Sequence, residues 1–378
     1  MKPYLTILLD SFRMLKARTI FWVTLAISLF VALVYLSMGF DETGTSLFFG
    51  LSHFESDMFR EGTSQSETLY VSIFTKLIAE YWLSWIAVLL ALISCVAIFP
   101  EALKEGTAGM ELTKKLSRFQ VFAAKFVGSL LFVTIQVLAF VLIVFLALRW
   151  RLGSWNPSIF WYVPLILLVF TYLYSFMMVI AVKTRSVMTA LVLTLVLWAI
   201  SSVIGFFEGN LYTMIQTLEM SEKFEAEARE SAKPLGVDLE GEEGGQIEEG
   251  AEDQVQVDDP EPLEEPFVDR DNGDTGILSM KLWYQRLLAA YAIFPKTGRT
   301  MEIADRLIVV NGEKGGAKGS FMSIIMGFEE EEDQNDMFIE LSEKAADRHS
   351  GTYAIGTSVL FSLTMLVWAG WIFCRKEI

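Results

Sequence analysis

The sequence is poor in the residues that build metal centres and disulfide frameworks. Its 378 residues include two cysteines, Cys95 and Cys374, and two histidines, His53 and His349. Each cysteine falls within or at the end of an apolar run, where a thiol behaves as a small hydrophobic group. No spacing typical of a zinc site or of a disulfide framework occurs. We therefore expect neither metal ligands nor catalytic residues in this chain.

Charge is missing from the cores of six long apolar stretches. A membrane-spanning helix needs roughly 20 consecutive apolar residues, and 53% of the residues are hydrophobic. Because these cores hold no Asp, Glu, Lys or Arg, a proton-coupled carrier is disfavoured. With their flanking residues, the predicted spans cover about 19–40, 78–99, 121–148, 158–182, 187–207 and 351–374.

A few isolated polar side chains remain within the spans. Interhelical hydrogen bonds explain them better than a substrate pathway does, although a pathway stays open as the alternative. They are Ser94, Thr134, Gln136, Ser201 and Ser202.

The Lys and Arg residues of the short segments predict the orientation, because such residues are retained on the cytoplasmic side. They gather in residues 1–18, in the connector after the second span, in the turn at 183–185 and in the tail 375–378. Both termini are therefore expected in the cytoplasm of a multi-pass protein of the cytoplasmic (inner) membrane. Arg149 and Arg151 are the two exceptions to this rule.

Two further segments differ from the spans in composition. Residues 1–18 carry an apolar stripe at helical spacing and are predicted to form an amphipathic elbow in the membrane interface. Residues 208–350 contain 34 acidic and 13 basic side chains and are predicted to form an external insert. Within it, 234–273 is too polar to fold, and helices are expected at 219–233, 278–294, 301–310 and 336–348.

The first external loop, residues 41–80, is acidic and rich in turn residues. Near its end, Lys76 and Glu80 lie four residues apart, a spacing that supports one exposed helical face. The second helix is therefore expected to project beyond the membrane.

The glycine-rich segment 311–320 invites comparison with a phosphate-binding loop. It does not fit that motif, because Ala317 stands where the second glycine is required and no buried strand precedes it. We interpret the segment as an external loop. If this protein works with ATP, the ATP and its Mg²⁺ must be bound by another subunit.

The connector between the second and third spans, residues 100–120, is short and charged. Gly106 can end one helix, and Thr107 can act as the N-cap of the next. Three apolar residues then offer contacts, and three basic residues face water, lipid headgroups or a protein partner; they are Met110, Leu112 and Leu116, and Lys114, Lys115 and Arg118. A simpler interpretation is an interfacial loop whose basic residues only fix the topology.

This connector resembles the cytoplasmic segment of ABC type-2 exporter permeases. The resemblance rests on a Glu-Gly-Thr break, an amphipathic turn, a Ser-Arg pair and a lysine where the third helix begins. Two features differ: Leu116 stands where the family often has proline, and the external insert is longer than usual. The matching residues are Glu101, Glu105, Gly106, Thr107, Lys114, Lys115, Ser117, Arg118 and Lys125.

The resemblance implies that the connector is a coupling helix, which docks onto a separate ATPase subunit. The chain would then be a permease subunit that moves an unidentified substrate outward, without an ATPase site of its own. Its partners would be a dimer of ABC ATPase subunits, a second permease copy or a paralogue, and membrane lipid, but no nucleic acid. The alternative is a membrane scaffold or sensor whose acidic external domain recruits partners.

Together, the sequence predicts an all-α polytopic membrane protein with six transmembrane helices. The predicted additions are an N-terminal amphipathic elbow helix, a cytoplasmic coupling helix and a large, partly disordered acidic external insert.

Overall fold

The computed structural model describes residue 13 and residues 19–42, 44–55, 59–103, 117–232, 270–310, 313–314 and 350–375. These residues fall into two compact units, Met1–Phe206 with Ala290–Ile378, and Phe207–Ala289. The elbow, most of the connector and the acidic centre of the insert lie outside the described residues, as does the end of the tail.

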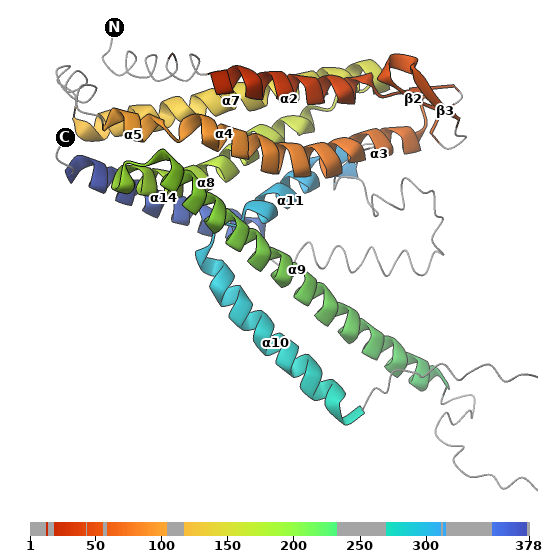
Figure 1. Cartoon of the computed structure of the whole chain (residues 1–378). Coiled ribbons are helices and arrows are strands. Elements are labelled where there is room, and N and C mark those ends of the chain that lie inside the picture. Colours follow the sequence, from red (N-terminus) through yellow and green to blue (C-terminus); the bar gives the residue numbers. More distant parts are fainter. Residues whose placement is uncertain are drawn as a thin grey trace, which may run out of the picture. The chain divides into compact units, whose positions relative to one another are not determined.

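The described part of the chain is built mainly from long helices (Figure 1). The helices are α2 Thr19–Ser37, α3 Ser64–Ser72, the π-helix η2 Ile73–Ala87, α4 Val88–Cys95, α5 Ile98–Ala102, α7 Arg118–Leu152, α8 Tyr162–Thr184, α9 Val187–Ala232, α10 Arg270–Ile293, α11 Thr297–Leu307 and α14 Gly351–Arg375. Two 3₁₀ turns, η1 Phe48–Gly50 and η3 Pro157–Trp161, and the strands β1 Gly39–Asp41, β2 Gly44–Leu47, β3 Ser52–Glu55, β4 Val309–Val310 and β5 Glu313–Lys314 complete the described elements.

The prediction of six spans is confirmed, because six helices among the described residues are long and apolar enough to cross a membrane. The first of them ends at Ser37, before the predicted residue 40, and α7 is longer at both ends than the predicted 121–148. The largest differences concern the second and fifth spans. The second span is part of a helical segment that already begins at Ser64, because the hydroxyl of Thr63 accepts a hydrogen bond from the N–H of Ser66 and caps it. The fifth span continues without a break into the predicted charged helix, so that α9 ends only at Ala232.

Two segments adopt strands where the sequence predicted none. Residues 39–55 form a three-stranded antiparallel sheet with the order β1-β2-β3. The expected helix at 301–310 stops at Leu307, and Val310 then pairs with Glu313 in a short hairpin. Ile308 to Val310 are β-branched, a side-chain type that favours strands.

Helix α8 is the centre of the first unit. Helices α7, α14 and α11 pack on it, and large side chains such as Phe170 and Tyr174 are fully enclosed. Helices α2, α9 and α14 instead expose large apolar residues, among them Phe30 at 66%, Phe206 at 67% and Val367 at 71%. These faces suit contact with lipid or with another apolar surface.

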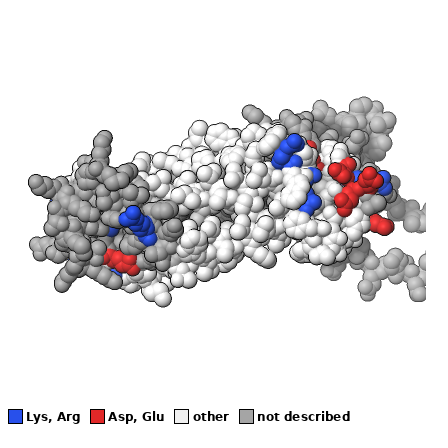
Figure 2. All heavy atoms as spheres, turned by 90° about the horizontal axis from the view of Figure 1, so that it is seen from above, with Lys and Arg blue, Asp and Glu red and all other residues white. Residues whose placement is uncertain are grey.

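Charged side chains avoid the middle of the spans. On the face shown in Figure 2, Lys, Arg, Asp and Glu residues gather at the two ends, and the surface between them is uncharged. Such a band is what a helical membrane protein needs, because a charge in the hydrocarbon core is costly.

A reciprocal contact between two tyrosines joins α2 to α3. The hydroxyl of Tyr35 donates to the carbonyl of Tyr70 and the hydroxyl of Tyr70 donates to the carbonyl of Tyr35, both over 3.1 Å. Their ring centroids are 4.4 Å apart, and both side chains are buried. Both polar tips are thus satisfied inside an apolar interface.

The two arginines that ran against the orientation rule bind backbone carbonyls. Arg151 Nε donates to the carbonyl of Leu36 over 2.9 Å, at the C-terminal end of α2. Helix ends leave carbonyls without intrahelical partners, and a guanidinium there satisfies them and complements the helix dipole. Arg149 donates to the carbonyl of Gly153, the left-handed residue that ends α7. The two arginines therefore have a structural role at this end of α2 and α7, where they bind backbone carbonyls.

The second unit is a helical hairpin formed by the outer part of α9 and by α10. The hydroxyl of Tyr284 donates to Glu208 over 3.1 Å, and Lys281 forms an ion pair with Glu219 at 2.7 Å. The segment that joins the two helices lies outside the described residues.

The tyrosine contact makes a prediction about stability. Replacing Tyr70 by Phe removes one buried hydrogen bond and should lower the free energy of unfolding by about 0.5–1.5 kcal/mol. Tyr81→Phe is the matched control, because that side chain is 60% exposed. Unfolding in mixed micelles, followed by circular dichroism, measures both. Equal stabilities of the two variants would contradict a role for the contact.

Candidate functional site

Helix α7 begins sharply at the end of the connector. Ser117 Oγ accepts from the backbone N–H of Gln120 over 3.3 Å, and the N–H of Ser117 donates to Gln120 Oε1 over 3.0 Å. This reciprocal pair is a capping box, which the Ser-x-x-Gln spacing encodes locally. Ser117, predicted as a coupling residue, thus also fixes the point at which the connector becomes the third span.

The same end of α7 is tied to α5 and α14. Arg118 Nη1 donates to the carbonyl of Cys374 over 3.4 Å, near the C-terminal end of α14. The rings of Phe99, Phe122 and Phe373 form a cluster, with centroid distances of 5.3 Å, 5.7 Å and 6.3 Å. The second, third and sixth spans therefore meet directly beside the connector.

Of the other predicted coupling residues, the structure describes two, Glu101 and Lys125. Glu101 is half-buried near the end of α5. Lys125 is only 4% exposed and is not on the surface of the chain. The remaining ones, Glu105, Gly106, Thr107, Lys114 and Lys115, lie outside the described residues.

A second site, which the sequence did not predict, is a polar cavity with a volume of about 370 Å³. Its walls come from η2, α9 and α11, with Tyr291 added from the end of α10. Because cavities of roughly 300–1,000 Å³ hold small ligands, its size is sufficient for one. The charged residues in its lining are Lys76, Glu80, Arg299, Glu302 and Asp305.

Asp305 joins three elements at one edge of this cavity. Its Oδ2 accepts from Lys76 Nζ of η2 over 3.1 Å, and its Oδ1 accepts from the hydroxyl of Tyr162 of α8 over 2.5 Å. The Tyr162 side chain is fully buried. Both carboxylate oxygens are therefore occupied by donors, which fixes α11 against η2 and α8.

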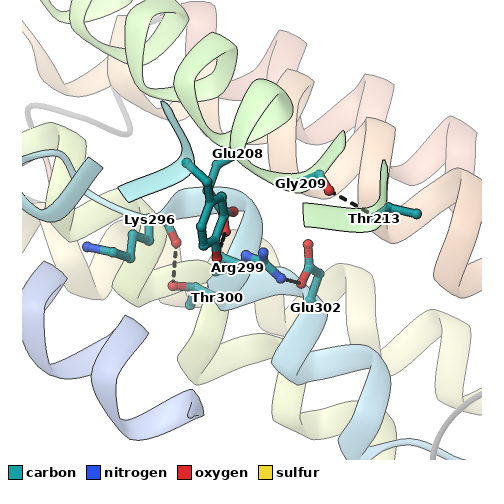
Figure 3. A network of polar contacts seen from close by, with 8 residues as sticks. Glu208, Gly209, Thr213, Lys296, Arg299, Thr300 and Glu302 are labelled. Atoms are coloured by element: carbon teal, nitrogen blue, oxygen red, sulfur yellow. Dashed lines mark hydrogen bonds and ion pairs between the residues drawn. The ribbon is translucent and has the colours of Figure 1, made fainter. Parts of the chain in front are cut away.

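The first turn of α11 holds a second set of polar contacts (Figure 3). Arg299 Nη1 forms an ion pair with Glu302 Oε2 at 2.6 Å, while the Arg299 side chain is only 7% exposed. Thr300 Oγ1 donates to the carbonyl of Lys296 over 2.9 Å. The completely buried Lys296 donates from Nζ to Thr357 Oγ1 over 3.0 Å, anchoring this turn to α14.

The pairing of Lys76 differs from the one expected. Within its helix it could have faced Glu80, but its ammonium binds Asp305, 229 residues further along the chain. The sequence does show Lys76 and Glu80 beside an apolar run, and it shows three charged residues at helical spacing after Pro295. Neither pattern predicts that Lys76 contacts a residue of the second group.

The isolated polar residues of the spans divide into two kinds. Ser94 and Thr134 donate to carbonyls four residues earlier in their own helices, so the expected interhelical bonds are not formed there. Ser201 donates to the carbonyl of Pro295 over 2.6 Å, and with Ser202 it lines the cavity. The interhelical bond expected of the Gln136 amide group is not formed by its Nε2, which is buried without a hydrogen-bond partner among the described residues, beside a small, mainly apolar cavity.

The lining of the cavity combines charged and aromatic side chains. Among the described residues, no group of three or more His, Cys, Asp or Glu side chains could hold a metal ion. Trp85 and Trp198 stack beside the charged residues, with centroids 4.8 Å apart and planes 19° apart. Such a lining can bind a ligand that carries both charge and apolar surface.

No protein-family model, curated protein or solved structure matches this chain.

The Asp305 contacts predict a graded loss of stability. Asp305→Asn keeps an acceptor for Tyr162 and removes only the partly exposed ion pair, which should cost about 0.2–1 kcal/mol. Asp305→Ala also leaves the buried Tyr162 hydroxyl without its acceptor and should cost about 1–3 kcal/mol. Unfolding measurements in mixed micelles compare the two with Glu61→Ala, an exposed control. The same loss in all three variants would contradict this account.

Proposed function

We propose that this chain is the permease subunit of an ATP-driven exporter of the ABC type-2 class. In this proposal it lies in the cytoplasmic membrane with both termini in the cytoplasm and pairs with a second copy or a relative. Two separate ATPase subunits bind ATP and Mg²⁺ and supply the energy. The substrate is unidentified.

The observation that carries the proposal is the joint at the ends of the connector. The connector leaves α5 and enters α7 at a capped residue, Ser117, and the Phe99, Phe122 and Phe373 cluster holds these two helices against α14. A force on the connector would thus be transmitted to the second, third and sixth spans together. This is what a coupling helix requires, and an interfacial loop that only fixes topology has no need of it.

The apolar faces of α2, α9 and α14 give further support. A permease that works as a dimer needs apolar helix faces for its lipid and for its second copy, and these three helices expose large side chains such as Trp22, Met188 and Leu360. The absence of a phosphate-binding loop from the sequence fits an ATPase on another subunit.

Reversing the charges of Lys114 and Lys115 tests the coupling role. If the connector docks onto an ATPase, the double variant Lys114→Glu, Lys115→Glu should reduce the amount of ATPase that copurifies with the tagged chain from its native membranes by about tenfold. Two lost charge pairs at an interface justify this size. Lys183→Glu, at an exposed position in the last turn of α8, controls for charge at the membrane surface where the connector is predicted to lie. Undiminished ATPase in the double variant would contradict the docking role.

The scaffold or sensor function remains the second candidate, and the separate hairpin unit Phe207–Ala289 is the observation that favours it. Deleting residues 234–273 distinguishes the two. A permease should keep its ATPase partner and its ATP hydrolysis after the deletion, because its spans and connector are intact. A scaffold should keep its membrane insertion but lose its bound external partners. Copurification and ATPase assays read out both results.

A further inference from the structure

The cavity between η2, α9 and α11 contains one carboxylate that differs from its neighbours. Asp305 binds Lys76 and Tyr162, and Glu302 binds Arg299. Glu80, by contrast, forms no hydrogen bond or ion pair with any residue that the structure describes. The nearby charges that act on it are the cationic Lys76 and the anionic Asp305 and Glu302. With three carboxylates against the basic Lys76 and Arg299, the charged lining of the cavity carries one excess negative charge.

The π-helical segment η2 contributes both Glu80 and an aromatic ring to the cavity. In a π-helix the hydrogen bonds run from residue i to i+5, so residues five apart follow one another along one side. Thr75, Glu80 and Trp85 have this spacing, and all three line the cavity. Short π-helical segments often occur at functional sites, and here the segment supplies a carboxylate and an indole to one cavity.

Aromatic side chains of η2 and α9 line the cavity together with the charged residues of η2 and α11. Trp85 is 44% exposed and stacks on Trp198, and Phe206 is 67% exposed. The face of a tryptophan attracts organic cations more strongly than the rings of the other aromatic residues do.

We propose that this cavity binds an organic cation with an apolar body, with Glu80 as its counter-ion and Trp85 as its aromatic contact. An anion fits less well, because the basic groups in the lining, Lys76 and Arg299, already bind carboxylates. The ammonium group of a lipid headgroup and that of a free amphiphilic cation share this chemistry. The site does not depend on the proposed coupling to an ATPase.

Binding of tritiated benzyltrimethylammonium to the full chain in dodecyl maltoside micelles tests the proposal. Saturable binding that benzenesulfonate, an anion of similar size, does not displace is expected. Glu80→Gln should weaken the affinity about fivefold, the effect of losing one partly exposed charge pair. Trp85→Leu should weaken it about two- to fivefold, as expected for a lost cation–π contact at an exposed site. Glu67→Gln, in the preceding helix α3, is the matched control and should bind as the unmodified chain does.

Two results would overturn the proposal: no saturable binding to the unmodified chain, or equal affinities in all variants that fold. Melting temperatures in the same micelles identify the folded variants, and Trp85→Leu decides alone if Glu80→Gln does not fold. Competition by dihexanoylphosphatidylcholine, but not by the corresponding phosphatidylglycerol, would assign the natural cation to lipid headgroups. Failure of both lipids to compete would assign it to a free cation.

Discussion

The constraint on which this structure depends is that hydrocarbon offers no hydrogen-bond partner, so each polar group in a span must be satisfied by the chain itself. The helical hydroxyls obey it locally: Thr171, for example, donates to the carbonyl of Leu167 over 2.6 Å. At the interface of α2 with α3, Tyr35 and Tyr70 satisfy each other. At the end of α2, Arg151 binds carbonyls that the helix leaves free.

The two candidate sites lie on different elements and serve different purposes. The joint of α5, α7 and α14 depends on aromatic packing and on one capped helix start, and these make it stiff. The cavity of η2, α9 and α11 has a volume of about 370 Å³, and the polar contacts of Asp305 fix α11 against η2 and α8 at its edge. Helix α8 packs against both α14 and α11. A movement of α14 near the connector would therefore displace α8 and α11. Such a displacement would connect the proposed docking of an ATPase with the proposed ligand-binding cavity.

How far the sequence could predict the fold depends on whether a feature is local. Six uncharged runs of membrane length predicted six helices, and the structure has six such helices. The capping box at Ser117 could also be predicted from the sequence, because both of its partners lie within four residues of each other. The strands at 39–55 were missed because short segments rich in Gly and Thr resemble turns. The pairing of Lys76 with Asp305 was missed because the helical spacing offered the nearer Glu80.

The sequence by itself determined the number of spans, the uncharged band between the charged ends and the acidity of the insert, because these depend on composition and on runs of adjacent residues. Only the tertiary structure decided which charges are neutralised. Asp305 and Lys76 meet because α11 packs beside η2 and α8, and Tyr162 completes the set from a third element. That arrangement leaves Glu80 available within the cavity. No local pattern could separate Glu80 from the other carboxylates, since the difference lies in partners that are far away in the chain.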